Sequence, residues 1–316
     1  MSSSTTTKWT SRYKRAELDE PLKLRKVDEQ ILEWFLPGKF KYLTPRMLAV
    51  LLDYKIDSVQ KRLRVLFDAH YLKRIYRPQG PTGSTEVVYT LDKVGAKHLT
   101  QLTGQKVKVY DTKGPNEYRL MLDHALAINT FLVCVIAACE VTENVSLSFF
   151  YPDHEFSWRV DMGEKKFESL VPDAVVGIIK DGVQRNFFVE VQRSTGKTKQ
   201  GIKSKDERYT VRRKLQRYHT LKKSPYNYLD QFPNENYPEL ENPKNMRVLY
   251  ISEVGGQEYE NALEIGKKAS GNTQGSALIW FTQLENIDIE RPESVFGEIW
   301  DVPHDVLFEH KKTIIE

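Results

Sequence analysis

Cysteine is scarce in this sequence of 316 residues, which has only Cys134 and Cys139, both in the apolar run FLVCVIAACE. Two cysteines cannot build a disulfide framework, and they do not make a zinc site. Because cysteine is one of the most frequently buried residue types, we expect two free thiols inside a helix. The pattern favours a protein of a reducing compartment, the cytoplasm.

Long hydrophobic segments are also lacking. The N-terminal stretch MSSSTTTKWTSRYKR has no apolar core, which argues against a signal peptide. The apolar run Ala125–Cys139 is too short to span a bilayer, and it contains Asn129. We therefore expect a soluble protein without a membrane partner.

Several catalytic patterns are missing as well. The seven histidines show no metal-ligand spacing, which argues against a relaxase of the tyrosine-using, histidine-metal type. No Ser/His/Asp arrangement stands out, and sixteen tyrosines are too many to single out one nucleophile. STGKTKQG contains the GKT of a phosphate-binding loop, but the first glycine of that motif is replaced by Val191.

Charge is unevenly distributed along the chain. The net charge is +4, but between Arg193 and Lys223 there are twelve Lys or Arg residues and only two acids. A basic block in a nearly neutral protein indicates local contact with a polyanion. The cations of this block that we expect to contact DNA are Lys197, Lys199, Lys203, Lys205, Arg212, Arg213 and Arg217.

The length is sufficient for two domains. Three helix-like segments occupy 27–36, 43–52 and 55–72, and two short strands at 73–77 and 87–91 follow on either side of a Pro/Gly loop. This order is typical of a winged helix-turn-helix. The expected divisions are a flexible basic arm at 1–22, the winged helix at 23–105, a linker at 106–118, a second domain at 119–305 and a tail at 306–316.

Local signals refine the winged-helix prediction. Thr44 and Pro45 are suited to begin the second helix, and Asp57 or Ser58 to cap the third. Apolar residues of the third helix repeat with the helical period, which leaves its polar residues facing outward. The residues that we expect to face DNA are Gln60, Lys61 and Arg64 on this helix, and Lys73, Arg74 and Arg77 at the wing.

The second domain begins with a long helix at about 116–140, followed by strands and then by alternating strands and helices. Such an order predicts a mixed sheet flanked by helices, in a fold of the α+β or α/β class. Tyr226–Asn242 is rich in Asn, Pro and acids and is expected to be a loop.

Asp173 and Glu190 lie inside the two apolar strands that are predicted within FESLVPDAVVGIIKDGVQRNFFVEVQRS. Asp181-Gly182 is a strong two-residue turn signal, and a turn at that point places Asp173 directly opposite Glu190. Gln192 lies on the same face as Glu190. Like charges in opposite positions destabilise a sheet, so the pair requires an explanation other than packing.

Three interpretations remain open from the residues alone. The two carboxylates share a proton, they are matched by nearby cations such as Lys214, or they hold a divalent metal ion. A metal beside a basic surface indicates phosphodiester chemistry, in which the ion activates water while the cations hold the nucleic acid.

Pro172-Asp173, the hairpin and Glu190-Val191-Gln192 resemble the PD-(D/E)XK nuclease motif. The predicted winged helix, His124 in LMLDHALAIN, the PDA triplet, EVQRST and KLQRY resemble the replication-relaxation family of plasmid proteins, over about residues 25–300. That family is similar to plasmid-mobilisation relaxases of the restriction-endonuclease-like kind. The resemblance implies a restriction-endonuclease-like second domain.

The resemblance also implies site residues. Asp173 and Glu190 become ligands of Mg²⁺ or Mn²⁺, with Gln192 beside them where the motif usually has lysine. Lys214 in the following helix is the candidate for a migrated lysine that takes the place of the missing one. Glu117 is the candidate for an additional helix-borne acid. His124 lies either near the site or, as we favour, in the core.

Two functions follow. The first is a metal-dependent endonuclease or nickase of a mobile element, active in plasmid replication, relaxation or mobilisation. The second is a non-catalytic replication or transcription factor that binds DNA and has a degenerate nuclease-like domain. The expected partners are double-stranded or nicked DNA, other replication or mobilisation proteins, and a second copy of the chain.

Overall fold

The computed structural model divides into two compact units, Met1–Leu122 and Asp123–Glu316. The residues that it describes are 14–75, 86–110, 115–152, 158–164, 166–192, 210–223, 246–272, 274–304 and 311–315, without the side chains of 115–120. The following predicted features lie outside these ranges: the wing loop, Arg77, the four DNA-contacting lysines between 197 and 205, and the whole expected loop at 226–242.

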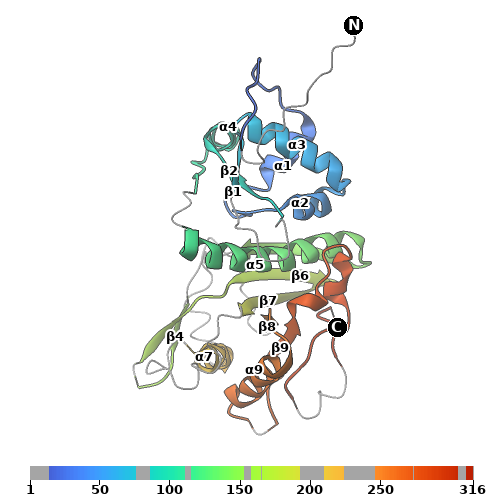
Figure 1. Ribbon diagram of the computed structural model, residues 1–316. Helices are drawn as coiled ribbons and strands as arrows, with labels where there is room; N and C mark the ends of the chain where they lie inside the picture. The colour runs from blue at the N-terminus through green and yellow to red at the C-terminus, as the bar shows by residue number, and fades with distance from the viewer. Residues whose placement is uncertain are drawn as a thin grey trace. The chain divides into compact units, whose positions relative to one another are not determined.

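In its described part, the first unit contains four helices and one antiparallel strand pair (Figure 1). Its elements are α1 (Lys26–Glu33), α2 (Pro45–Leu52), α3 (Ile56–Asp68), β1 (Leu72–Ile75), β2 (Val88–Leu91) and α4 (Lys93–Thr103). The order of three helices and a strand pair is the predicted one, whereas α4 was not predicted.

The start of α2 confirms the local prediction, because Thr44 Oγ1 accepts a 3.2 Å hydrogen bond from the N–H of Met47 and Pro45 is the first helical residue. At the start of α3, the predicted cap of Asp57 or Ser58 is wrong. The residue that precedes this helix is Lys55, which makes no side-chain capping hydrogen bond. Asp57 instead lies in the first turn, where its charge interacts favourably with the helix dipole.

The predicted arm is attached to the first unit from Lys14 onward. Arg15 pairs with Asp92 at 2.5 Å, and its guanidinium group lies 4.3 Å from the centre of the Phe67 ring. The N–H of Ala16 donates to Asp68 at 2.9 Å. The expectation of a free arm is therefore wrong for these residues, because Asp92 and the buried Asp68 bind them.

The second unit is built on a five-stranded mixed sheet with the order β3-β6-β7-β8-β9. Its strands β3, β6 and β7 are antiparallel, and β7, β8 and β9 are parallel. The strands are β3 (Val145–Pro152), β6 (Ala174–Lys180), β7 (Val183–Gln192), β8 (Met246–Ser252) and β9 (Ile279–Gln283). The predicted mixed sheet flanked by helices is confirmed.

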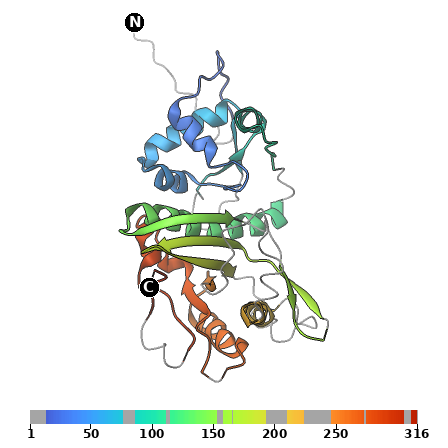
Figure 2. The ribbon, with the colours of Figure 1, turned by 180° about the vertical axis from the view of Figure 1, so that it is seen from behind.

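Helices cover both faces of this sheet (Figures 1 and 2). One face is covered by α5 (Pro115–Val141), and the other by α7 (Val211–Lys223) and α9 (Gly256–Ala269). The helices α7 and α9 connect the parallel strands, since parallel neighbours require a crossover. A separate ribbon of β4 (Trp158–Asp161) and β5 (Phe167–Leu170) lies beside α7.

Helix α5 contains both cysteines, which are free and buried as predicted. Its apolar part, Met121–Val141, has 21 residues and is long enough to cross a membrane, which corrects the shorter span expected from the sequence. However, 67% of its most apolar stretch is buried inside the fold. This burial is that of a core helix.

The turn between β6 and β7 has the predicted length of two residues. Asp181 and Gly182 both have positive φ, 51° and 78°, as a type I′ turn requires. Lys180 pairs with Val183. Along the hairpin, Gly177 is needed because a Cβ there would lie 2.2 Å from the Phe149 ring on β3.

Candidate functional site

Asp173 lies at the end of the hairpin opposite the turn. The last ladder pair is Ala174 with Val189, so Asp173 directly precedes β6. The prediction had placed Asp173 inside the strand. Its N–H donates to the Val189 carbonyl at 3.0 Å, and its Oδ2 accepts a 2.8 Å hydrogen bond from the N–H of Val191. These two bonds hold the carboxylate beside Glu190.

Glu190 is buried in β7, with 3% of its surface exposed. The Tyr218 hydroxyl, from α7, donates to Glu190 Oε1 at 2.5 Å. Lys214 Nζ, one turn earlier on α7, contacts Glu190 Oε2 and lies 3.9 Å from Asp173 Oδ1. The two predicted acids and the predicted lysine therefore converge at one point.

His124 of α5 reaches the same point from the opposite face of the sheet. Its Nε2 lies 3.4 Å from Asp173 Oδ1. The side chain is 28% exposed, so the favoured core role is wrong. Gln192 also lies nearby, where its Oε1 accepts a hydrogen bond from the Tyr250 hydroxyl.

These residues line a pocket of about 500 Å³. Its polar walls come from the sheet, α5 and α7, and its apolar walls include valine and leucine side chains. The lining residues with ionisable or amide groups are His124, Asp173, Glu190, Gln192, Lys214, Arg217 and Tyr250. A buried group of acids, a cation and an amide in one pocket is typical of a functional site.

Burial and charge act differently on the two acids. Burial raises the pKa of Glu190 to about 7, against the opposing charge of Lys214. Burial also acts to raise the pKa of Asp173, but Lys214 and His124 outweigh it, so that pKa is lowered. The two carboxylates raise the pKa of Lys214, although its own burial opposes this. Near neutral pH the pair thus holds Asp173 ionised and Glu190 close to its titration point.

The side chains fit a divalent cation in ligand type, since Mg²⁺ and Mn²⁺ prefer carboxylate oxygens. Oxygens of Asp173 and Glu190 both face the ammonium group of Lys214, so these two carboxylates are the residues that would hold such an ion. Within the described ranges, no group of three or more His, Cys, Asp or Glu side chains could hold a metal. Two protein carboxylates would therefore be the core of the ligand set.

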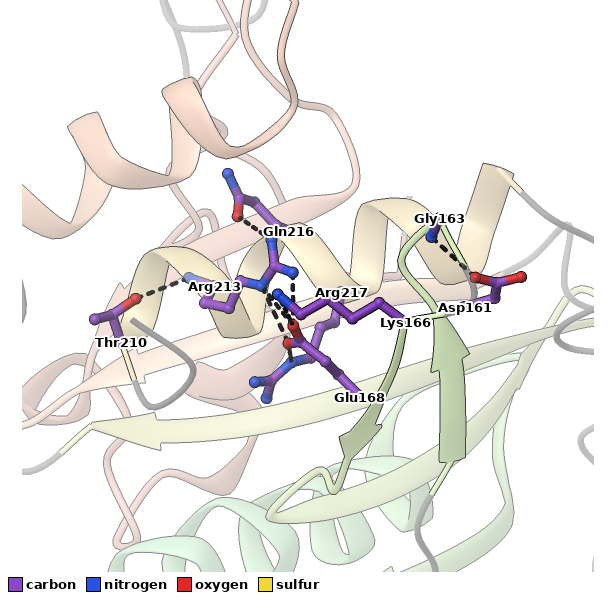
Figure 3. Close-up of polar contacts among 8 residues, drawn as sticks. All are labelled: Asp161, Gly163, Lys166, Glu168, Thr210, Arg213, Gln216 and Arg217. Atoms are coloured by element: carbon purple, nitrogen blue, oxygen red, sulfur yellow. Dashed lines mark hydrogen bonds and ion pairs between the residues drawn. The ribbon is translucent and has the colours of Figure 1, made fainter. Parts of the chain in front are cut away.

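Of the three α7 arginines that were predicted to contact DNA, two bind a carboxylate of the protein and one is exposed. Figure 3 shows Arg213 and Arg217 directed at Glu168 of β5, which binds them at 2.6 Å and 2.8 Å. This corrects their assignment to the DNA-facing surface, because a buried carboxylate already binds both guanidinium groups. Arg212 is exposed and remains a candidate for phosphate contact.

In the first unit, Gln60 and Lys61 are exposed on α3 as predicted. Arg64 is half-buried and pairs with Asp68 at 2.7 Å, which corrects its outward placement.

The described wing cations also have protein partners. Arg74 donates to the Tyr89 hydroxyl at 3.0 Å and lies 4.5 Å from the centre of the Phe67 ring. Lys73 donates to the Tyr110 carbonyl at 2.5 Å. Arg74 is therefore part of the packing of the first unit.

Some of the predicted site residues lie outside the part of the chain that the structure describes. The side chain of Glu117 and the residues Arg77, Lys197, Lys199, Lys203 and Lys205 are not among those described. Sequence reasoning missed Tyr218, Tyr250 and Glu168. A signal existed for Tyr218, because KLQRY separates it from Lys214 by one helical turn.

The second unit is thus an α+β fold in which two acids and a lysine converge in one pocket. A family model described as Replication-relaxation matches residues 38–230, more than half of the chain. The chain belongs to the replication-relaxation family. Membership of this family fits a role in DNA processing.

Among curated proteins, no match to the sequence was found. Among solved structures, the restriction endonuclease FokI aligns at 10% identity over 84% of this chain and 43% of that chain, with a TM-score of 0.27. The chain thus spans less than half the length of FokI.

Proposed function

We propose that the protein is a metal-dependent DNA endonuclease or nickase that acts in the replication, relaxation or mobilisation of a plasmid or related element. The observation that carries the proposal is the convergence of Asp173, Glu190 and Lys214 in one pocket. A purely structural hairpin has no need for two opposed acids at this place.

Each group has a role under this proposal. Asp173 and Glu190 hold Mg²⁺ or Mn²⁺, which when bound supplies an activated water and neutralises charge on the phosphate. Lys214 supplies the positive charge that Gln192 cannot offer to the developing phosphorane oxygens. His124 orients Asp173, and Tyr218 orients Glu190.

DNA recognition belongs to the first unit in this proposal. Its helix order is consistent with a winged helix-turn-helix, with Gln60 and Lys61 on the groove-facing helix and Arg212 of α7 contacting phosphates in the second unit. The cytoplasm as location, a second copy of the chain and other replication or mobilisation proteins as partners belong to the same proposal.

A plasmid assay tests it. Supercoiled plasmid is incubated with wild type or Asp173→Ala, with Mg²⁺ or Mn²⁺ across a concentration series, and DNA binding is measured on the same preparations. We expect nicked or linear product only with wild type and metal, and equal DNA binding by both proteins. Intact DNA binding without nicking at any metal concentration would exclude the enzyme.

One observation favours a second function, that of a non-catalytic DNA-binding replication or transcription factor. The ammonium group of Lys214 occupies the point where the carboxylates meet, so an internal ion pair satisfies the two acids without metal. Titration with Mn²⁺ separates the two functions. Specific Mn²⁺ binding that disappears in Asp173→Ala supports the nuclease, and absence of such binding supports the factor.

A further inference from the structure

The buried Glu168 of β5 is the centre of a cluster of charges outside the proposed catalytic set (Figure 3). Arg213 Nη2 donates to Glu168 Oε1 at 2.6 Å, and Arg217 Nε donates to Glu168 Oε2 at 2.8 Å. Lys166 Nζ lies 3.7 Å from Oε1. Both carboxylate oxygens thus bind helix α7, from positions that are one helical turn apart.

The next pair of positions on α7 binds the other acid. Lys214 and Tyr218, again one turn apart, contact the two oxygens of Glu190. Each member of this pair follows a member of the arginine pair by one residue, which is a rotation of about 100° around the helix. Two carboxylates on two different sheets therefore bind two neighbouring stripes of the same helix.

We propose that Glu168 is a positioning residue for Lys214: its bonds to Arg213 and Arg217 fix the rotation and axial position of α7, and so hold the lysine over the acid pair. This inference rests on the proposed function for the role of Lys214, but its geometric part is independent of activity. Because the helix is rigid, a rotation that removes the arginines from Glu168 also removes Lys214 from Glu190.

The ribbon that carries Glu168 is itself fixed in the core. Trp158 of β4 is 2% exposed and packs against the Phe188 ring of β7, with ring centres 4.8 Å apart. Glu168 pairs with Val160 across the ribbon. The carboxylate therefore has a fixed position relative to β7, the strand that carries Glu190.

Charge favours a permanent anchor. Hydrogen bonds from Arg213 and Arg217 lower the pKa of Glu168 to about 2, although burial opposes this effect. The carboxylate is therefore ionised at neutral pH. A buried ion cluster is a poor way to gain stability alone, since apolar side chains of similar size serve as well. A directional bond to a helix gives a defined geometry, which apolar packing of one residue does not.

The test uses the full-length Glu168→Gln variant, which keeps the shape of the side chain and removes its charge. The first readout is acylation of lysines without DNA or metal, analysed by mass spectrometry. We expect labelling of Lys214 to rise severalfold relative to the exposed Lys268, because its amine leaves Glu190. The second is single-turnover nicking, which we expect to fall about tenfold or more at unchanged DNA affinity, since small misplacements of a catalytic group have effects of this size.

Matched controls separate positioning from general weakening. Val145→Ala removes a buried side chain from β3, at the position paired with Lys180 near the hairpin turn, and changes no charge. Lys166→Ala removes the exposed cation that also faces Glu168 but lies outside α7. Both variants are expected to keep wild-type labelling of Lys214 and wild-type nicking, even where Val145→Ala lowers the melting temperature.

A folded Glu168→Gln protein with wild-type labelling of Lys214 overturns the inference, whatever its activity. Increased labelling supports the inference even if the wild type does not nick DNA, in which case only the proposed function fails. If Glu168→Gln does not fold, Arg213→Lys answers the same question. It keeps the charge but loses the forked contact with both carboxylate oxygens.

Discussion

The Asp173 carboxylate accepts a hydrogen bond from the backbone N–H of Val191 at 2.8 Å. This bond continues the pairing of the hairpin by one step after the ladder between β6 and β7 has ended. It places the second Asp173 oxygen toward Lys214 and His124. The acid at the first position of the motif is thus oriented by the strand that carries the second.

Asp173→Asn separates this structural role from a catalytic one. The amide oxygen still accepts from Val191, so the melting temperature is expected to stay near that of the wild type. Nicking is expected to fall at least about a thousandfold, as with other essential catalytic groups. Equal loss of nicking and of folding, seen by thermal melting beside the plasmid assay, would contradict this expectation.

Lys214 is the next test, since it stands where the motif lacks its usual lysine. We expect Lys214→Met to lower nicking about a hundredfold, the size of effect seen when one stabilising donor is removed. Mn²⁺ affinity should be kept or raised, because a competing cation is gone. Lys214→Arg, which keeps the charge, serves as the comparison. Weaker Mn²⁺ binding by Lys214→Met, measured by calorimetry, would count against a metal site between the acids.

The raised pKa of Glu190 gives a pH dependence of stability. Its folded-state pKa of about 7 exceeds the ordinary value of 4.5, so the folded protein keeps a proton that the unfolded chain has lost between these values. The resulting stabilisation is present below pH 4.5 and is lost as the pH rises through 7. Glu190→Gln lacks this loss, so between pH 5 and pH 8 its free energy of unfolding should gain about 1 to 3 kcal/mol relative to wild type. Denaturant melts at the two pH values measure this difference, and parallel curves would contradict it.

Two neighbouring cations of α3 provide a matched pair for the first unit. Lys61 is exposed, whereas Arg62 donates to the buried Asp28 at 2.8 Å and 2.6 Å. We expect Lys61→Ala to reduce the slope of log affinity against log salt by about one, with unchanged stability. Arg62→Ala should instead lower the free energy of unfolding by about 3 kcal/mol, because it leaves a buried acid without its partner. Fluorescence anisotropy and thermal melting distinguish them, and an unchanged slope for Lys61→Ala would remove α3 from the DNA interface.

Arg212 and Arg213 form a second pair, on α7. Arg212 is exposed and is expected to contact a phosphate, so Arg212→Ala should also reduce the salt slope by about one. Arg213 binds Glu168 and should affect the salt slope little, while lowering stability. If the double variant reduces the slope by about two, the guanidinium group of Arg213 leaves Glu168 when DNA binds, and the assignment made here is wrong.

The sequence was sufficient for features controlled by short-range chemistry. Asp181-Gly182 predicted the turn and its register, and Thr44-Pro45 predicted the start of α2, because both depend on the backbone preferences of two residues. The residue that caps α3 was misplaced by two or three positions, since Asp57 or Ser58 was expected and Lys55 precedes the helix. Lys55, which precedes the helix, has no side chain suited to capping, so no local signal marks it.

Long-range pairings were harder to predict. Nothing near Glu168 in the sequence indicates that two arginines 45 and 49 positions later will bind it. The same pairing explains why counting charges overstated the number of cations available to DNA in α7. The contact between Lys214 and Glu190 could be predicted for one reason only. The motif has Gln192 where lysine is usual, and the helix that follows contains Lys214 as a substitute.

The two-residue bend at Asp181-Gly182 lies about 25 Å along β7 from Glu190, since each residue advances a strand by about 3.4 Å. Strand side chains alternate between faces, so a slip of one residue in the pairing that begins at this bend would turn Asp173 away from Glu190. The acid pair therefore depends on a register that is set at a place remote from any substrate, although the bend itself touches none of its groups.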